Sequence, residues 1–181
     1  MPILSGKAAV IDYLRTKEKD GLSWTSIITG AFLDFGLATG FLGFDIPNRK
    51  ATLFDEADVP ATLTTYATVA KSVVGVLSRP AETANRFVHV QSVVATQAEI
   101  LAALEKATGA TFAVERKQAT DLRDSGLAAL QAGGGPDVLN LLVWGLFGRG
   151  NGGDYGRTKD DNALLGLERE TLDEVIQPRV A

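Results

Sequence analysis

The sequence contains no cysteine and only one histidine among its 181 residues. Without cysteine the chain has no disulfide, no thiolate metal site and no cysteine nucleophile, which is compatible with a reducing compartment. A single histidine also leaves no second imidazole to share a metal ion. We therefore expect no metal site, and any redox chemistry needs a cofactor.

Excess positive charge and long apolar runs are also missing. The chain has 18 Lys and Arg residues against 22 Asp and Glu residues, a net charge of −4, and the basic residues are scattered among the acids. This distribution argues against a nucleic-acid partner. No run approaches the roughly 18 apolar residues that a membrane span needs, and the N-terminus lacks a signal-peptide pattern. We expect a cytoplasmic protein with no membrane partner.

The apolar residues that are present suffice for one folded domain. They make up 45% of the chain, against 22% charged residues, which is typical of a globular protein.

The spacing of the apolar residues predicts a first helix over residues 6–19, capped by Ser5 and followed by Gly21 in a turn. The segment SWTSIIT, residues 23–29, has β-branched residues on both faces and predicts an interior strand of a parallel sheet.

Strands and helices then alternate along the chain. The patterns predict a strand over 51–54, a helix that starts at Thr65 and cannot continue past Pro80, and a strand of about six residues within RFVHVQSV. Capping boxes at Thr96–Glu99 and Thr171–Glu174 predict two further helix starts, and Gly109 ends the first of these helices. TFAVER reads as the strand that completes a strand-helix-strand unit.

This order predicts an α/β fold with a parallel sheet followed by a mostly helical region. We place the sheet in residues 1–110 and the helical region in residues 111–181, as parts of one structural unit. The two regions follow from the alternation of strand and helix patterns in the first part and the run of helical patterns in the second.

Two glycine-rich segments match phosphate loops in composition but not in context. GRGNGGDYGR, residues 148–157, satisfies GxGxxG, yet a dinucleotide-binding turn must leave a strand and open a helix. A predicted helix precedes this loop and none follows at once, so we interpret it as a flexible loop. The same reasoning excludes the segment from Gly36 to Gly43.

The polar motifs also favour structural interpretations. His89 lies in the middle of a predicted strand, where a hydrogen bond to a neighbour explains it better than a metal does. Asp160, Asp161 and Asn162 precede two leucines, and such short polar residues usually form a turn or a helix cap.

Lys7 is the one candidate for acid-base chemistry. It shares a helix face with Val10, Ile11 and Leu14, which we expect to face the core, and it sits in the first turn. Partial burial and the helix dipole would both favour the neutral amine, as a general base requires. The alternative is a lysine whose ammonium group extends from the helix end into water.

Several ordered blocks resemble the carboxy-terminal part of an NmrA-like protein, from the group related to isoflavone reductases and atypical short-chain dehydrogenases. The resemblance covers about residues 5–176 and rests on these segments: GKAAVIDYLR, GLSWTSIITGAFLDFGL, GFLGFD, RPAETANRFVHVQS, ATQAEILAALEKATG and DNALLGL. It implies that residues 1–110 form a partial Rossmann-like parallel sheet and that residues 111–181 form a mostly helical substrate region. It also implies a reductase that passes a hydride between NADP or NAD and a small apolar substrate. Lys7 resembles the family's proposed catalytic base by position. The resemblance also implies that Thr29, Gly30, Phe32 and Phe35 line the nicotinamide and substrate.

The chain departs from this family in one large respect, because it has no GxxGxxG turn after an initial strand. The half of the sheet that holds the pyrophosphate is therefore absent from the sequence, which leaves cofactor binding and independent catalysis open. An alternative is a non-catalytic regulator that senses dinucleotide and binds a protein partner, and another is an inactive fragment. Loss of the first strands would also expose SWTSIIT as an edge, to be covered by something else or paired with another chain.

Overall fold

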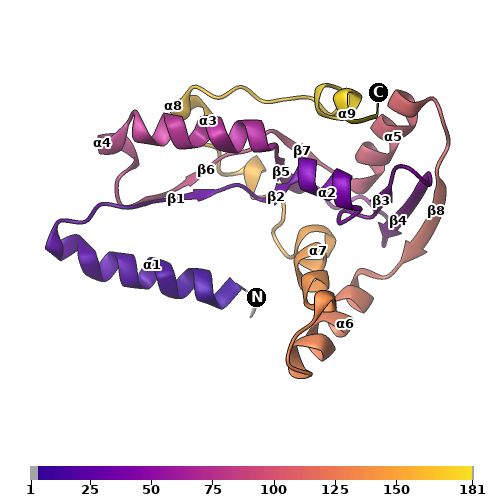
Figure 1. The fold of residues 1–181 in the computed structure, drawn as a ribbon, viewed down its shortest axis with the longest axis horizontal. Coiled ribbons are helices and arrows are strands. Elements are labelled where there is room, and N and C mark those ends of the chain that lie inside the picture. The colour runs from indigo at the N-terminus through magenta and orange to yellow at the C-terminus, as the bar shows by residue number, and fades with distance from the viewer. Residues whose placement is uncertain (1–3, 181) are drawn as a thin grey trace.

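The structure, a computed structural model, describes residues 4–180 and has the expected α/β fold (Figure 1). The strands are β1 Thr25–Ile28, β2 Ala31–Phe32, β3 Phe44–Asp45, β4 Lys50–Phe54, β5 Ala61–Thr64, β6 Arg86–His89, β7 Val93–Ala95 and β8 Ala113–Lys117. The α-helices are α1 Ser5–Lys17, α2 Leu33–Thr39, α3 Tyr66–Leu77, α4 Pro80–Thr83, α5 Gln97–Thr108, α6 Ala119–Gln131, α7 Asn140–Phe147, α8 Asn162–Leu165 and α9 Leu172–Val180. Short 3-10 segments are η2 Glu18–Asp20, η3 Pro136–Leu139 and η4 Tyr155–Arg157.

The strands pair in three groups. β1 runs parallel to β6, with Thr25 opposite Arg86 and Ile28 opposite His89. β2 runs parallel to β5, which pairs antiparallel with β7. β4 pairs antiparallel with β3 and parallel with β8. The predicted parallel strand is confirmed, but its interior position is wrong, since within residues 4–180 the strand β1 has β6 as its one neighbour.

The capping boxes and the glycine that follows a helix predicted their helix ends correctly, whereas the Ser5 cap did not. Thr96 and Glu99 form the predicted capping box, and Gly109 ends α5 in the left-handed conformation. The Thr171 hydroxyl accepts from the Glu174 amide, while the Glu174 carboxylate accepts from the Thr171 amide. The predicted Ser5 cap is wrong, because Ser5 is already the first helical residue of α1 and no side chain caps this end.

The strand predicted within RFVHVQSV divides into β6 and β7. Between them, the Gln91 amide donates to the side chain of Asn162 at 3.1 Å, and the Ser92 amide donates to the Leu63 carbonyl at 3.0 Å. These bonds to other parts of the chain replace the ladder that would have continued the strand.

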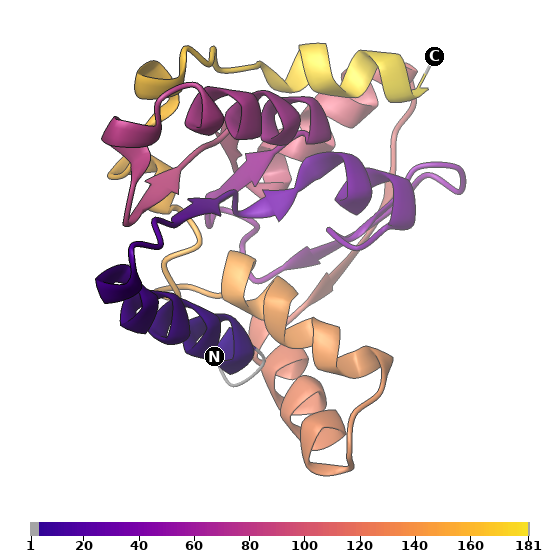
Figure 2. The same ribbon diagram turned by 60° about the vertical axis from the view of Figure 1, so that its left-hand side comes forward.

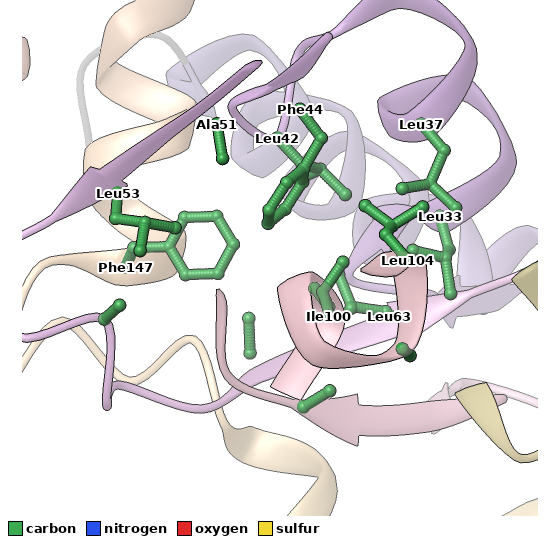
Figure 3. Close-up of a cluster of buried hydrophobic side chains, with 14 of the residues drawn as sticks. Leu33, Leu37, Leu42, Phe44, Ala51, Leu53, Leu63, Ile100, Leu104 and Phe147 are labelled. Carbon is green, nitrogen blue, oxygen red and sulfur yellow. The ribbon is translucent and has the colours of Figure 1, made fainter. Parts of the chain in front are cut away.

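The larger hydrophobic core lies among α2, the strands β3 to β5, α5 and α7 (Figure 3). Its fully buried side chains include Leu33, Leu42, Phe44, Leu63, Ile100, Leu104 and Phe147. A smaller core joins β6 and α3 to α8 through Val76, Val88, Val90 and Leu165. No described helix, across residues 4–180, has the length and apolar character needed to cross a bilayer.

Helix α1 does not contribute a buried face to either core. Figures 1 and 2 show it on the opposite side of β1 from α3. Val10 is 56% exposed, Ile11 and Leu14 are half-buried, and Lys7 is exposed. The expectation that this stripe faces the core is therefore wrong for the described chain.

The chain beyond β8 is mainly helical, as predicted for the residues after TFAVER. α6 and α7 pack closely, since a Cβ atom at Gly126 would lie 2.7 Å from Leu141 Cγ. The strand β8 is exposed along its length and returns the chain to β4 before α6 begins. The helical part is thus attached to the sheet by a strand as well as by packing.

Replacing Gln97 should destabilise the fold. This side chain is fully buried, and its amide accepts from the Phe54 amide at 2.8 Å and donates to the carbonyls of Leu42 and Thr52 at 3.0 and 3.1 Å. Gln97→Ala leaves these buried backbone groups without partners, so we expect a loss of about 2–4 kcal/mol in the free energy of unfolding, measured by urea titration. The exposed control Gln131→Ala should change it by less than about 0.5 kcal/mol. Equal effects of the two variants would contradict this account.

Candidate functional site

The candidate site lies where β1 and β6 end, because α/β folds bind ligands at the carboxyl ends of parallel strands. The chain bends there at Gly30, which has a φ of +64°. A Cβ atom at this position would lie 2.2 Å from the Thr62 carbonyl oxygen. The Thr64 hydroxyl donates to the Thr29 carbonyl at 2.5 Å. Glycine is thus required for the close approach that brings β2 against β5.

Two aromatic side chains form an exposed wall just after this bend. The rings of Phe32 and Tyr66 lie with their centroids 5.3 Å apart, and they are 39% and 50% exposed. Phe35 is 43% exposed and packs on Phe41 with a centroid distance of 5.9 Å. The Asp34 carboxylate accepts from the Tyr66 amide at 2.5 Å, which joins α2 to the start of α3. Apolar surface of this kind suits a flat, apolar ligand.

The first turn of α3, which carries Tyr66, is held by a buried network. The Glu170 carboxylate accepts from the hydroxyls of Thr65 at 2.7 Å and Thr68 at 3.0 Å. Burial pushes the pKa of Glu170 upward, but hydrogen bonds from Ser92, Thr65 and Thr68 outweigh it and hold this pKa below its ordinary value. A fixed carboxylate at a helix N-terminus also complements the helix dipole.

Lys7 differs most from its predicted environment. The lysine is exposed in the first turn of α1, so the partial burial expected for an acid-base lysine is wrong. Among residues 4–180, no described hydrogen bond, ion pair or ring contact joins Lys7 to Thr29, Gly30, Phe32 or Phe35. The predicted lining residues thus lie in one stretch from the end of β1 into α2, and no described interaction links the predicted base to them.

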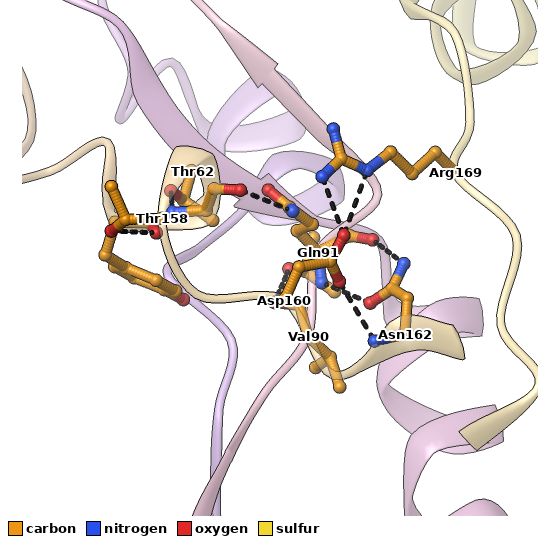
Figure 4. Close-up of polar contacts among 10 residues, drawn as sticks. Thr62, Val90, Gln91, Thr158, Asp160, Asn162 and Arg169 are labelled. Carbon is orange, nitrogen blue, oxygen red and sulfur yellow. Dashed lines mark hydrogen bonds and ion pairs between the residues drawn. The ribbon is translucent and has the colours of Figure 1, made fainter. Parts of the chain in front are cut away.

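A buried polar cluster lies next to the bend (Figure 4). Gln91 is 1% exposed, and its side-chain amide donates to the Gly156 carbonyl at 2.8 Å. The Gly156 amide donates to the Thr62 hydroxyl at 2.9 Å. Asn162 donates to the Gln91 carbonyl at 2.7 Å. The end of the glycine-rich loop, expected to be flexible, is thus attached to β5 and to the segment between β6 and β7.

Tyr155, in the same loop, is a residue that sequence reasoning missed. Its hydroxyl oxygen would lie 3.2 Å from a Cβ atom at Gly30, and its ring meets His89 edge-on at 5.5 Å. Within the described chain, the Tyr155 hydroxyl and the Gln91 side-chain oxygen are buried without hydrogen-bond partners. Burial raises the pKa of Tyr155, which keeps the phenol neutral. An isolated tyrosine in a loop gives no periodic signal that could have identified it.

His89 is held by a carboxylate, in agreement with its structural interpretation. Its backbone amide donates to Asp161 Oδ2 at 2.8 Å, and its ring Nδ1 lies 3.7 Å from the same oxygen. Arg86 donates to the other oxygen of Asp161 at 2.6 Å. Burial lowers the pKa of His89, and the positive charge of Lys159 adds to this effect, so that together they outweigh the opposing pull of Asp161.

The acidic pair before α8 also serves a structural purpose. Asp160 accepts from the Asn162 amide at 2.9 Å and from Arg169 at 2.6 Å, as the turn-or-cap interpretation predicts. Among the residues that the structure describes, no group of three or more His, Cys, Asp or Glu side chains is arranged to hold a metal ion.

The described residues do not fit the pyrophosphate of a dinucleotide. The glycine-rich loop follows helix α7 and leads into the 3-10 segment Tyr155–Arg157, so it is not a strand-to-helix turn. The strand-to-helix connection from β5 to α3 runs through Thr65 and contains no glycine. Within residues 4–180, neither of these two connections is therefore a turn of the kind that holds the phosphates of a dinucleotide.

Comparisons with known proteins identify several similar proteins. No family model matches the chain. An oxidoreductase of Aspergillus flavus, aprR, is 35% identical over 171 residues, which are 94% of this chain and 57% of that protein. An isoflavone reductase structure matches 99% of this chain and 59% of its own, with a TM-score of 0.71 and 21% identity. The Escherichia coli quinone oxidoreductase QOR2 complexed with NADPH matches 92% of this chain and 57% of its own, with a TM-score of 0.65 and 19% identity.

These matches confirm the resemblance to the NmrA-like and isoflavone-reductase-related proteins. The shared fold is the Rossmann-like reductase fold, and aprR, a relative with 35% sequence identity, is named an oxidoreductase. The chain spans little more than half the length of the proteins it matches.

Substitution of Gly30 tests the bend. Gly30→Ala places a Cβ atom against the Thr62 carbonyl in a left-handed conformation, so we expect the free energy of unfolding to fall by at least about 2 kcal/mol in urea titration. Gly6→Ala, which has open space around it in α1, should be neutral or stabilise the protein by up to about 1 kcal/mol. A neutral Gly30→Ala would mean that the close approach to Thr62 does not exist in solution.

The single histidine offers a direct pH measurement. Because burial lowers its pKa, the imidazole of His89 should titrate below the ordinary value of 6.5 in an NMR titration. Asp161→Asn should lower the midpoint further, since it removes the group that raises the pKa. As the pH falls, His89 in the unfolded chain binds a proton before His89 in the folded chain does. The contribution of His89 to the free energy of unfolding is therefore lost as the pH falls from 6.5 through the pKa of the folded state. A midpoint at or above 6.5 would show that Asp161 outweighs burial.

Proposed function

We propose, on the resemblance to the NmrA-like reductases, that this chain forms the substrate-binding part of an NAD(P)H-dependent reductase acting on a small apolar substrate. One observation carries the proposal: an exposed aromatic wall stands at the carboxyl ends of parallel strands, beside a bend that requires glycine. Strand ends of this kind bind ligands in open α/β sheets.

In this proposal each group at the strand ends has a role that its own chemistry supports. Phe32 and Tyr66 pack against the flat face of the substrate, and Phe35 extends the apolar surface. Thr29 and Gly30 form the backbone floor beside them. Lys7 supplies or removes the substrate proton, a role that rests on its position in the resemblance. A dinucleotide supplies the hydride, and its nicotinamide end is the part that the residues at the strand ends would hold.

A regulator that binds dinucleotide without consuming it is the second candidate. Two observations favour it: Lys7 is exposed, and burial lowers the pKa of His89, which favours the neutral imidazole. The described residues therefore include no pair of groups arranged for acid-base catalysis.

Calorimetric titration with NADPH and with NADH separates these functions. Binding of either nucleotide by the chain, followed by nucleotide consumption when a small quinone is added, supports the reductase. Binding without consumption supports the regulator. No heat change at millimolar nucleotide contradicts both functions for this chain on its own.

Substitution of Lys7 tests its role in the reductase. If Lys7 handles the substrate proton, Lys7→Ala should reduce the rate of NADPH consumption by about 100-fold or more, because general acid-base groups contribute effects of this size. Lys19→Ala removes another exposed lysine just beyond α1 and should leave the rate unchanged. The rate is followed by loss of NADPH absorbance. Equal rates in Lys7→Ala and the unmodified protein would remove the lysine from the mechanism.

A further inference from the structure

A groove of about 410 Å³ lies between α3 and the turn after α8. It is lined on one side by α3 and the two residues that follow this helix, and on the other side by Leu165, Gly166 and Leu167. Figures 1 and 2 show α8 beside α3. We infer that this surface, the α3–α8 groove, binds a small organic anion with a carboxylate on an apolar chain. The inference is independent of the proposed function, because Phe32 and Tyr66 do not line this groove.

Two glycines form the floor of the groove. A Cβ atom at Gly75 would lie 2.9 Å from Leu165 Cβ and 3.1 Å from the Leu165 carbonyl oxygen, so α3 meets the end of α8 with its own backbone. Gly166 has a φ of +68°, and the reversal there lets the Leu167 amide donate to the Asn162 carbonyl at 2.9 Å. Because neither glycine carries a side chain, the surface between the helix and the turn is hollow.

The walls of the groove are mainly apolar. Val74 is 64% exposed, Leu165 is buried and Leu167 is half-buried. Leu165 belongs to the smaller core with Val88 and Val90, so this wall is fixed by the packing beneath it. Volumes of roughly 300–1,000 Å³ with apolar walls and a few polar groups are typical of small-molecule sites. The α3–α8 groove has both properties.

Both charged residues in the lining are basic. Lys71 precedes Gly75 by four residues and therefore lies on the same side of α3. The Arg79 guanidinium lies 3.9 Å from the position of a Cβ atom at Gly166, beside the turn. Within residues 4–180, neither Lys71 nor Arg79 forms an ion pair. Lys71 interacts electrostatically with Glu170, but that carboxylate accepts hydrogen bonds from two threonine hydroxyls at the start of α3.

Apolar walls together with two basic side chains define the class of ligand. An apolar chain would pack on Val74, Leu165 and Leu167. The planar guanidinium of Arg79 can bind a carboxylate through two parallel hydrogen bonds, and Lys71 can add a further charge-assisted bond. The same two side chains would repel a cation.

A second copy of this chain fits the groove less well than an anion does. If two copies met around a two-fold axis at the groove, Lys71 and Arg79 would face the same two residues across the contact. Like charges placed against each other disfavour such a contact. The charge of the groove therefore favours a carboxylate over a second copy.

Octanoate is a suitable probe, because it joins one carboxylate to a short apolar chain. In an NMR titration of the whole chain, we expect saturable shifts of the amide resonances of residues 70–79 and 165–167. Octan-1-ol has the same chain length without the charge. It should bind at least roughly tenfold more weakly, because it cannot form the charge-assisted hydrogen bonds.

Matched variants test the two basic residues. The double variant Lys71→Gln/Arg79→Gln should weaken octanoate binding by at least roughly tenfold and leave octan-1-ol binding unchanged, which loss of the fold would not do. Arg123→Gln removes an exposed arginine of α6 and should leave the affinity for octanoate unchanged.

Three results would overturn the inference. The first is no saturable shift of the groove amides at about 10 mM octanoate, where even a millimolar site is occupied. The second is equal affinity for octanoate and octan-1-ol. The third is a change of the same amide resonances with protein concentration in the absence of a probe, because the groove then belongs to a second copy.

Discussion

The approach of Gly30 to the Thr62 carbonyl is the contact on which the candidate site depends. It permits β1 to pair with β6 before the bend and β2 to pair with β5 after the bend. Because β2 then runs beside β5, Phe32 arrives next to Tyr66, which begins the helix after β5. A side chain at residue 30 would force these strands apart and separate the two rings.

The same bend explains why the polar cluster forms where it does. With β5 held against β2, the Thr62 hydroxyl accepts from the Gly156 amide, and the Gln91 side chain donates to the Gly156 carbonyl. A loop that glycine composition marks as flexible is thereby fixed by bonds that are remote in sequence. Its Tyr155 ring is placed between His89 and the bend, where the hydroxyl has no partner in the described chain.

The sequence-based predictions were accurate where the interacting residues lie close together in the sequence, and they failed where those residues lie far apart. Thr96 with Glu99 and Thr171 with Glu174 were predictable because each pair acts within one helical turn. The gap between β6 and β7 was not predictable, because it depends on Asn162, 71 residues away from Gln91. The stripe on α1 was correctly recognised as apolar. Periodicity shows that one face of a helix is apolar, but it does not show which part of the protein packs on that face. Within residues 4–180, no element buries the apolar face of α1. Phe32 was named as a lining residue through the resemblance, whereas its ring contact with Tyr66 was not predicted, because that contact depends on the bend.

The free edge of β1 and the candidate site share one strand, and this links folding to function. Within residues 4–180 no strand pairs with this edge, and Thr29, directly after β1, accepts the hydrogen bond that holds the bend. A strand bonded on one side opens locally more readily than one bonded on both. A binding site needs its groups held within a fraction of an ångström, which rigid supporting elements provide. Covering the β1 edge would therefore do more than bury apolar surface, because it would fix the strand whose end carries Thr29 and Gly30.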